Sequence, residues 1–547
     1  MRRIVLILSL LIISHLALAG TIDQIIPKPQ SATLLKGEMR IKGPAIKCDP
    51  AMDQMSIDAV KRFAGKLSLV SGYTSSVSTP VGLKSVVDGG SAKGIIFLKD
   101  ASLDKEAYRI NVGEKAAVIR ASDQNGFLYA IQTLMQLLPE SIYGKKPSSS
   151  ERWTLPCCEI SDSPRFAYRG MHLDSSRHFW SVEQVKKYLD VMAYFKLNRF
   201  HWHLSDDQGW RIEIKSYPDL TRIGSFREGT MIGRSFSSND NIRYGGFYTQ
   251  EQIKDVVNYA ARLGIEVVPE IDLPGHMLAA LTAYPHLGCT GGPYATWTKW
   301  GVSDQVLCVG KESTFEFLEA VLGEVAELFP GQYVHIGGDE CPKTEWENCP
   351  ACQAKIAELG LADDDHYSAE QYLQSYVTRR IQDFLASKGK KIIGWDEILE
   401  GSLGQGATVM SYRGAVGAQK AAEMGIDAIL TPSSSCYFDY CQSEDTESEP
   451  VSFPATLLIE NVYALDPFEG VEEDKRHHII GVQGNLWTEY IKTMEHLEYM
   501  LLPRLLALSE VQWCTAENRD YERFTESLEN HGYKILEKAG YNYRKNL

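Results

Sequence analysis

Two adjacent carboxylic acids follow a short apolar run in the middle of the chain. Asp339 and Glu340 stand in the segment VHIGGDECPKTEW, directly after a Gly-Gly pair. Consecutive side chains of a regular strand point to opposite faces, so the two acids are not expected to act on one bond in the same way. We predict that one acid handles a leaving oxygen, while the other handles a neighbouring group of the substrate itself.

Acids, aromatic residues and histidines follow the other apolar runs in the same way. Any one of them alone is commonly a helix cap, but their arrival at one edge indicates a pocket. Carboxylates accept hydroxyl hydrogens and aromatic rings stack on C–H faces, so the set predicts a carbohydrate site. The residues are Asp174, His203, Asp206, Asp207, Glu270, Asp272, His276, Trp395, Asp396, Glu397, Tyr412, Arg413, Tyr437, Asp439, Trp487 and Glu489.

Eight strand-like runs position these residues, and amphipathic helical patterns follow most of them. The runs are YRGMHLD, NRFHWHLS, IEVVPEID, YVHIGG, KKIIGW, ATVMSY, DAILTP and HIIGVQGNLW. Capping boxes are predicted at Ser181, Thr249, Ser313 and Ser368, each with Gln or Glu three residues later. Eight β-α units predict an α/β fold with a (β/α)8 TIM barrel over residues 165–515, whose reactive groups sit at the C-terminal strand ends.

Shorter units are predicted on both sides of the barrel. Residues 1–19 have two arginines, an apolar run and a small-residue ending, which indicate a cleavable signal peptide and export to the periplasm or medium. A membrane anchor is the alternative, but the run is short for a span. Residues 20–160 mix strand-like and helical patterns and predict a small α/β domain. Residues 516–547 predict a helical extension packed on the barrel.

Charge narrows the class of partner. The formal net charge of the 547-residue chain is −15, which argues against nucleic acid because such binding needs concentrated Lys and Arg. An uncharged substrate is easier to accommodate, and no membrane span is expected after signal cleavage. The sequence sets no oligomeric state.

Histidine and cysteine patterns allow metal readings as well as structural ones. His201 and His203 alternate on one strand face, a spacing that metal hydrolases use, but the expected role is structural hydrogen bonding. Cys349 and Cys352 invite a zinc or redox interpretation. Because no second pair has zinc-finger spacing, a local disulfide or plain thiols are favoured. Further candidate loop staples are Cys289 with Cys308 and Cys436 with Cys441. The catalytic site is expected to hold no metal and no cofactor.

Six motifs, in order along the chain, resemble glycoside hydrolase family 20, the β-N-acetylhexosaminidases. They are RGMHLDSSRHF (169–179), FHWHLSDDQGWR (200–211), PEIDLPGH (269–276), HIGGDE (335–340), CYFDY (436–440) and GVQGNLWTE (481–489). SDQNGFLYAIQTLMQLL resembles the end of that family's small N-terminal domain. The resemblance implies an exo-acting enzyme that releases terminal GlcNAc, or GalNAc, with the substrate's own acetamido oxygen as nucleophile.

The resemblance also implies roles for individual residues. Glu340 is then the general acid and base, and Asp339 orients the acetamido group. Asp206 and His276 support the acid through a relay that raises the pKa of Glu340, with Asp207 as the other possible partner. The remaining residues bind the sugar: Arg169, Trp346, Trp395, Tyr412, Tyr437, Asp439, Trp487 and Glu489.

One residue departs from the family pattern. Tyr412 stands in VMSYRG where the family usually has Trp, so specificity near the outer hydroxyls is open. Three alternatives remain beside the leading one: a lacto-N-biosidase-like enzyme, an enzyme for sulfated GlcNAc, and a carbohydrate-binding protein without catalysis. The Asp339-Glu340 pair weighs against the last, because binding alone needs no proton donor.

Overall fold

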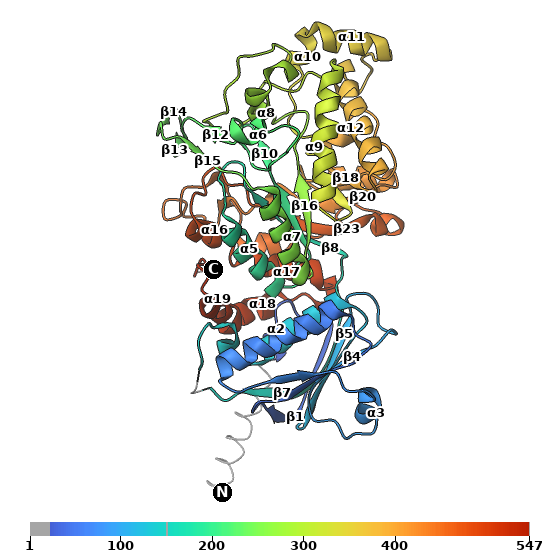
Figure 1. Cartoon of the computed structure of the whole chain (residues 1–547), viewed down its shortest axis with the longest axis vertical. Helices are drawn as coiled ribbons and strands as arrows, with labels where there is room; N and C mark the ends of the chain where they lie inside the picture. The colour runs from blue at the N-terminus through green and yellow to red at the C-terminus, as the bar shows by residue number, and fades with distance from the viewer. Residues whose placement is uncertain (1–21, 149–150, 546–547) are drawn as a thin grey trace.

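The computed structural model describes residues 22–148 and 151–545, and Figure 1 shows two layered units joined end to end. The predicted signal peptide, residues 1–19, lies outside the described residues. The N-terminal unit is at the foot of the view and the barrel stands above it. Within the described ranges, none of the helices combines the length and apolarity needed to cross a bilayer.

The N-terminal unit is a seven-stranded mixed sheet in the order β1-β7-β5-β6-β4-β2-β3. Its two main helices are α2 (Gln54–Ser71) and α4 (Gln124–Leu137). Both begin at an aspartate cap, Asp53 and Asp123, whose side chain accepts an N–H of the first turn. The strands are β1 (Ser31–Arg40), β2 (Ala45–Cys48), β3 (Ser76–Ser78), β4 (Gly94–Lys99), β5 (Tyr108–Val112), β6 (Ala116–Ala121) and β7 (Thr154–Asp162).

The second unit is a closed eight-stranded barrel with parallel neighbours, so the predicted fold is confirmed. Each strand falls within one of the eight apolar runs. The strands are β8 (Tyr168–Asp174), β9 (Arg199–His203), β16 (Glu266–Glu270), β17 (Tyr333–His335), β18 (Lys391–Trp395), β19 (Thr408–Ser411), β20 (Asp427–Leu430) and β23 (Ile479–Gly484). Parallel pairing brings all eight C-terminal ends to one rim of the barrel.

Helices wrap the barrel and bury their apolar faces against the strands. Capping boxes form at Ser181, Thr249 and Ser368 as predicted. The box predicted at Ser313 is wrong, because the helix begins one residue earlier, at Glu312, and Ser313 lies inside its first turn. The main helices are α5 (Val182–Tyr194), α7 (Gln250–Arg262), α9 (Glu312–Leu328), α12 (Ala369–Ser387), α13 (Val416–Glu423), α16 (Met494–Leu501) and α17 (Arg504–Trp513).

Buried ion pairs join the two units at the N-terminal ends of the barrel strands. Arg169 of β8 lies 2.9 Å from Glu106, and Lys196 lies 3.1 Å from Asp162 of β7. The C-terminal segment runs from α18 (Tyr521–Ser527) through a π-turn to α19 (Tyr533–Ala539), and Figure 1 shows it between the units. It contacts both of them, since His531 pairs with Glu140 and the Tyr541 hydroxyl donates to a carbonyl of α5.

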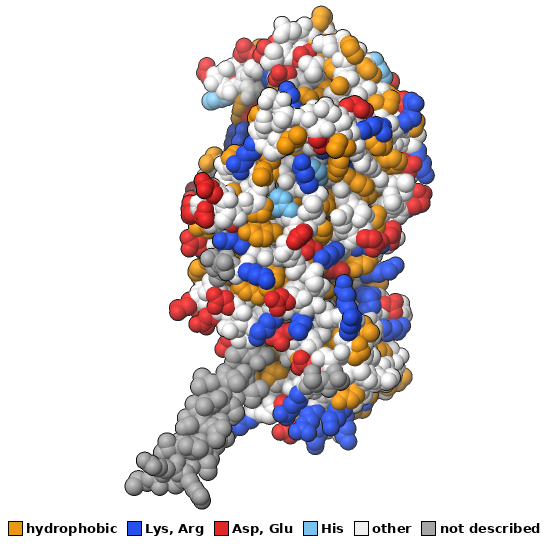
Figure 2. All heavy atoms as spheres, turned by 90° about the vertical axis from the view of Figure 1, so that its left-hand side faces the viewer, with side chains coloured by type: hydrophobic (Ala, Val, Ile, Leu, Met, Phe, Trp, Pro, Cys, Tyr) orange, Lys and Arg blue, Asp and Glu red, His pale blue; other side chains and the backbone are white. Residues whose placement is uncertain are grey.

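Surface charge is mixed on the face shown in Figure 2, where Lys and Arg alternate with Asp and Glu over most of the barrel. On this face no stripe of a single charge sign runs over the described barrel residues.

Candidate active site

A cavity of about 420 Å³ opens at the C-terminal rim of the barrel, a size typical of small-molecule sites. It brings together residues that follow seven of the eight strands. Those that matter below are Arg177, Asp206, Asp272, His276, Asp339, Glu340, Tyr412, Tyr437, Asp439, Trp487 and Glu489. A larger cavity of about 620 Å³ lies at the opposite end, between the units, away from these groups.

Asp339 and Glu340 belong to a tight turn in which several residues have left-handed backbone conformations. Strand β17 ends at His335, so the two acids lie beyond the regular strand. Gly337, Gly338 and Glu340 have φ values of 64°, 96° and 45°. A Cβ atom at Gly337 would lie 1.7 Å from Asp272 Oδ1, so only glycine fits there. The turn, rather than strand alternation, sends the two side chains apart: Asp339 is 13% exposed and Glu340 is 50% exposed.

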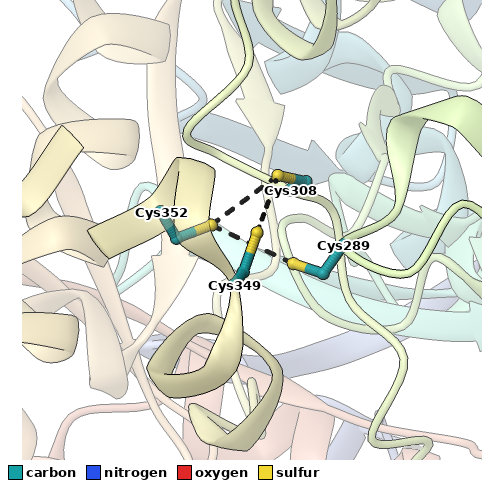
Figure 3. A group of neighbouring side chains, drawn as sticks. All are labelled: Cys289, Cys308, Cys349 and Cys352. Carbon is teal, nitrogen blue, oxygen red and sulfur yellow. Dashed lines mark hydrogen bonds between the residues drawn. The ribbon is translucent and has the colours of Figure 1, made fainter. Parts of the chain in front are cut away.

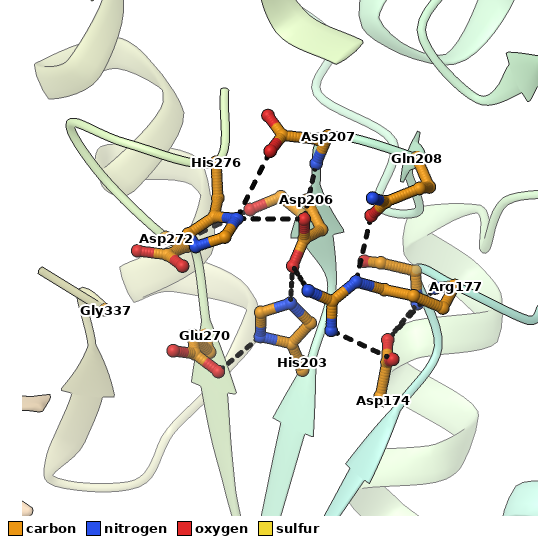
Figure 4. Close-up of polar contacts among 12 residues, drawn as sticks. Asp174, Arg177, His203, Asp206, Asp207, Gln208, Glu270, Asp272, His276 and Gly337 are labelled. Carbon is orange, nitrogen blue, oxygen red and sulfur yellow. Dashed lines mark hydrogen bonds and ion pairs between the residues drawn. The ribbon is translucent and has the colours of Figure 1, made fainter. Parts of the chain in front are cut away.

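His276 connects Glu340 to two buried aspartates. Its Nε2 lies 3.6 Å from Glu340 Oε2, and its Nδ1 lies 3.2 Å from Asp206 Oδ1 and 3.3 Å from Asp207 Oδ2. Figure 4 shows His276 facing both carboxylates, with Arg177 on the far side of Asp206. Both aspartates therefore contact the same nitrogen of His276. Asp206 also accepts from His203, whereas Asp207 is held by the backbone N–H groups of Leu278 and Ser303.

The relay lowers the pKa of the acid instead of raising it. Burial alone would lower the pKa of His276, but the charge and hydrogen bond of Asp206 raise it well above its usual value. The neighbouring His276, 3.6 Å away, then lowers the pKa of Glu340, and burial only partly opposes it. The prediction that the relay raises this pKa is therefore wrong for the substrate-free protein, because a cationic imidazole stabilises the carboxylate.

Asp339 shows the opposite shift. Burial raises the pKa of Asp339 to about 7. His276 opposes this shift, whereas the nearby charges of Glu340 and Glu270 add to it. Its Oδ1 is buried and has no hydrogen-bond partner among the described residues. A ligand that donates a hydrogen bond would supply the partner that this buried carboxylate oxygen lacks. Asp339 thus faces the cavity with an open acceptor.

The cavity arginine is Arg177, not Arg169. Arg169 lies at the start of β8 and is buried at the opposite end of the barrel, where it binds Glu106 and the hydroxyl of Tyr129. The prediction that Arg169 binds the sugar is wrong. Arg177 follows the end of the same strand, lines the cavity and lies 2.9 Å from Asp206 and 3.6 Å from Glu489. The strand-end rule itself selects Arg177, so the sequence carried the signal.

Two further acids, Asp439 and Glu489, line the cavity together with Arg177. Burial, followed by repulsion from Glu489, raises the pKa of Asp439 well above its usual value, and burial also raises the pKa of Glu489. Asp439 Oδ1 is another buried acceptor without a partner in the described chain. Aromatic rings form the neighbouring wall: the Tyr437 ring is stacked 6.3 Å from Tyr412, and Trp487 lies under the Arg177 guanidinium at 5.1 Å.

The other two tryptophans do not line the cavity. Trp346 lies in α10 (Thr344–Asn348), fully buried, and donates its Nε1–H to the Leu307 carbonyl, so the predicted sugar contact is wrong. Trp395 ends β18 and is buried one layer below the wall, with its ring 5.6 Å from Tyr412 and 5.9 Å from Trp487. It donates to Glu270 and supports the aromatic wall from behind.

Histidines fill the barrel interior beneath this wall. Glu270 Oε2 lies 3.0 Å from His201 and 2.5 Å from His203, while Oε1 lies 3.0 Å from His335. All four are fully buried. Glu270 therefore has a hydrogen-bonded neighbour on each oxygen, which fits the structural role expected for His201 and His203. Burial lowers the pKa of His201 to about 4, so this imidazole is neutral at physiological pH.

Comparison with known families identifies the family to which both units belong. Residues 166–516 match the catalytic domain of glycosyl hydrolase family 20, and residues 23–163 match domain 2 of the same family. The chain belongs to glycosyl hydrolase family 20. This confirms the resemblance carried by the six motifs. The members of this family are glycoside hydrolases.

Individual relatives agree with the family assignment. A beta-hexosaminidase of Porphyromonas gingivalis is 45% identical over 446 residues, a match that spans 81% of this chain and 55% of the relative's length. An exo β-N-acetylglucosaminidase of Vibrio harveyi, solved with N-acetylglucosamine, has a TM-score of 0.82 and 35% identity, covering 96% of this chain and 78% of that one. A β-N-acetylhexosaminidase of Streptomyces coelicolor also has a TM-score of 0.82, at 30% identity, covering 96% and 98%.

Proposed function

We propose that this family 20 chain is an exo-acting β-N-acetylhexosaminidase that removes terminal β-linked GlcNAc, or GalNAc, from glycans or chitin fragments. The observation that carries the proposal is the Asp339-Glu340 turn, which places a carboxylate with one unpaired oxygen in the cavity lining and a second carboxyl group beside His276. The named relatives act on this class of sugar, which supports the same substrate class here.

Asp339 is proposed to hold the acetamido N–H of the bound sugar. Its Oδ1 has the free acceptor position, and its wall of Tyr437, Tyr412 and Trp487 encloses a space suited to a methyl group. With the N–H held, the acetamido oxygen attacks the anomeric carbon and the C–O bond to the leaving group breaks. A positive oxazolinium ring forms, and the Asp339 carboxylate stabilises its charge.

Glu340 is proposed to give a proton to the departing oxygen and then to take one from water. Its side chain is half exposed in the free protein, and bound sugar would cover it. Removing water from a carboxylate raises its pKa, which would oppose the effect of His276 and bring Glu340 toward protonation. The relay through Asp206 and Asp207 positions His276 for that exchange.

Arg177, Asp439 and Glu489 are proposed to bind the hydroxyls of the terminal sugar. The three groups line the same cavity, in which Arg177 pairs with Glu489 and Asp439 has an oxygen without a partner among the described residues. Groups that bind the hydroxyls of the non-reducing terminus would leave no room for a further sugar unit there. The proposed enzyme therefore works from chain ends. We propose in addition that the chain is exported after cleavage within its first twenty residues.

One assay tests the proposal. Nitrophenyl β-glycosides of GlcNAc, GalNAc and glucose present the same leaving group and differ in the substituent at C2 or in the C4 hydroxyl. We expect turnover of the two acetamido sugars and a rate lower by orders of magnitude on the glucoside, which has no acetamido oxygen to attack. Equal rates on glucoside and GlcNAc would overturn the proposed mechanism, and so would a sugar trapped covalently on a side chain.

A further inference from the structure

Four cysteines far apart in the sequence meet at one point beside the barrel rim. Cys289 and Cys308 come from the long segment after β16, while Cys349 and Cys352 begin α11 (Pro350–Leu359). Figure 3 shows the four sulfur atoms converging from a loop on one side and the helix start on the other. All four lie within 4.8 Å of one another, and three of them are buried.

The spacing of the sulfur atoms is that of a tetrahedral metal site. The separations are 3.9 Å for Cys289 to Cys352, 3.7 Å for Cys308 to Cys352 and 3.5 Å for Cys308 to Cys349. Four sulfurs around Zn²⁺ at about 2.3 Å stand about 3.8 Å apart along each tetrahedron edge. A disulfide would instead bring two sulfurs to about 2.05 Å. None of the eleven cysteines, all within the described residues, forms one.

Backbone contacts hold both halves of the cluster in place. A β-bridge pairs Gly288 with Leu307, which sets Cys289 and Cys308 side by side. The Cys349 N–H donates to the Trp346 carbonyl, and Pro350 starts the helix that carries Cys352. Gly310 packs on the same helix start so closely that a Cβ atom there would lie 2.2 Å from the Ala351 backbone. The site is thus built before any ion enters.

We propose that Cys289, Cys308, Cys349 and Cys352 bind one structural Zn²⁺ as a four-cysteine site. Thiolate ligands in tetrahedral order favour zinc, and four protein ligands leave no open position for catalysis. Binding releases the thiol protons to solvent. A single four-sulfur cluster replaces two predictions from the sequence. The first is a local disulfide or plain thiols at Cys349 and Cys352, and the second is a staple of Cys289 with Cys308.

The metal would fasten together the two loops that carry the relay and the acid. Leu307 donates its N–H to Pro274 O, two residues before His276, and accepts from Trp346, six residues after Glu340. Gly275 packs against Cys341, since a Cβ there would lie 3.1 Å from the Cys341 Cα. The Zn²⁺ crosslinks the far ends of these segments. Its role is to fix the distance between His276 and Glu340 without touching substrate.

Metal analysis of the purified full chain, made in buffer with reductant and no added metal, tests the site directly. We expect one zinc per chain by inductively coupled plasma mass spectrometry. Cys289→Ser and Cys352→Ser should lose most of it, while Cys157→Ser, a buried cysteine of the N-terminal sheet, should keep it. The native chain with no zinc, or with zinc retained in both cluster variants, would overturn the proposal.

Cobalt gives a second readout that does not depend on activity. After unfolding in chelator and refolding with Co²⁺, the native chain and Cys157→Ser should show intense thiolate-to-cobalt absorption and the visible bands of tetrahedral Co²⁺. Cys352→Ser should show weakened and shifted bands. Two disulfides in the cluster would instead lower the intact mass by four hydrogen atoms and abolish these bands, which would overturn the site while leaving the proposed glycosidase intact.

Discussion

Two regions of this chain bury ionisable groups, and the pKa values of their carboxyl groups shift in opposite directions. At the junction of the two units, Arg169 and Lys196 each meet a carboxylate and a tyrosine hydroxyl, and the pKa of Glu106 falls to about 2 because Arg169 outweighs the cost of burial. At the rim, Asp339, Asp439 and Glu489 are also removed from water, but acids crowd together and their pKa values rise.

The contrast separates charge used for assembly from charge held for chemistry. Burial costs free energy in both regions, but at the junction protein partners offset the cost, and at the rim part of it remains. A carboxylate with a raised pKa and an open oxygen is stabilised when a ligand donates a hydrogen bond or develops positive charge. Substitutions at the rim should therefore alter rate, and substitutions at the junction should alter stability.

The largest effect is expected for Glu340→Gln. The amide cannot transfer the proton, so kcat on GlcNAc glycosides with poor leaving groups should fall about 10²- to 10⁴-fold, the contribution of a positioned acid. Nitrophenyl substrates need less protonation and should lose less. The melting temperature should stay within a few degrees of the native value, because Glu340 is half exposed. Equal losses on both substrate types would contradict the assignment.

Asp339→Asn should follow, with about a 10²- to 10³-fold loss in kcat, as when one group that stabilises transition-state charge is removed. Binding of a thiazoline that mimics the cyclised intermediate should weaken in parallel. Stability should hold or rise, since a neutral amide removes the repulsion that raises the Asp339 pKa. Full rate with undiminished inhibition would show that the carboxylate does not stabilise the intermediate.

The sequence predicted the barrel well because eight apolar runs of strand length, each ending in polar residues, leave few other folds. The same rule located Asp339, Glu340, His276, Tyr437 and Glu489 at the rim. It failed where residues were chosen by motif without regard to place along the strand. Arg169 is the first residue of its motif and lies at the N-terminal end of β8, away from the rim.

Other features depend on contacts that no local pattern records. The positive φ of Glu340 arises from a turn packed on Asp272, and the direction of its pKa shift depends on a histidine 64 positions away in the chain. Trp346 and Trp395 are fully buried whereas Trp487 lines the cavity, a difference that side-chain packing decides. The four-cysteine cluster joins two pairs separated by 40 residues of sequence, so neither pair alone revealed it.

Arg169→Met and Arg177→Lys compare the two regions directly. Loss of Arg169 leaves Glu106 buried without its cation and should reduce the free energy of unfolding by about 3 kcal/mol, with KM unchanged. Arg177→Lys keeps a charge but loses the fork that spans Asp206 and Glu489, so KM for nitrophenyl GlcNAc should rise. Denaturant unfolding and steady-state kinetics measure both. A change in KM caused by Arg169→Met would contradict the proposed division between stability at the junction and substrate binding at the rim.

Acid should weaken the junction in a defined window. The pKa of Glu106 is about 2 in the fold against an ordinary value of 4.5, so its ionised form favours the folded state above pH 4.5. That stabilisation, on the order of 3 kcal/mol, is lost as pH falls from about 4.5 toward 2. Glu106→Gln should flatten the stability curve across this window. An unchanged slope in that variant would assign the acid sensitivity to other carboxyl groups.

Tyr412 is expected to give the smallest effect, because its hydroxyl is already hydrogen-bonded within the protein. The hydroxyl donates to Glu397 at 2.7 Å, and burial raises the pKa of that acid to about 8. Tyr412→Phe removes one hydrogen bond, about 1 kcal/mol, and should lower kcat/KM several-fold at most. Tyr412→Trp supplies the family's usual ring and should alter the ratio of GlcNAc to GalNAc turnover while keeping the rate. A 10²-fold loss in the Phe variant would place Glu397 among the groups that hold the substrate, extending the rim's set of unpaired acids by one.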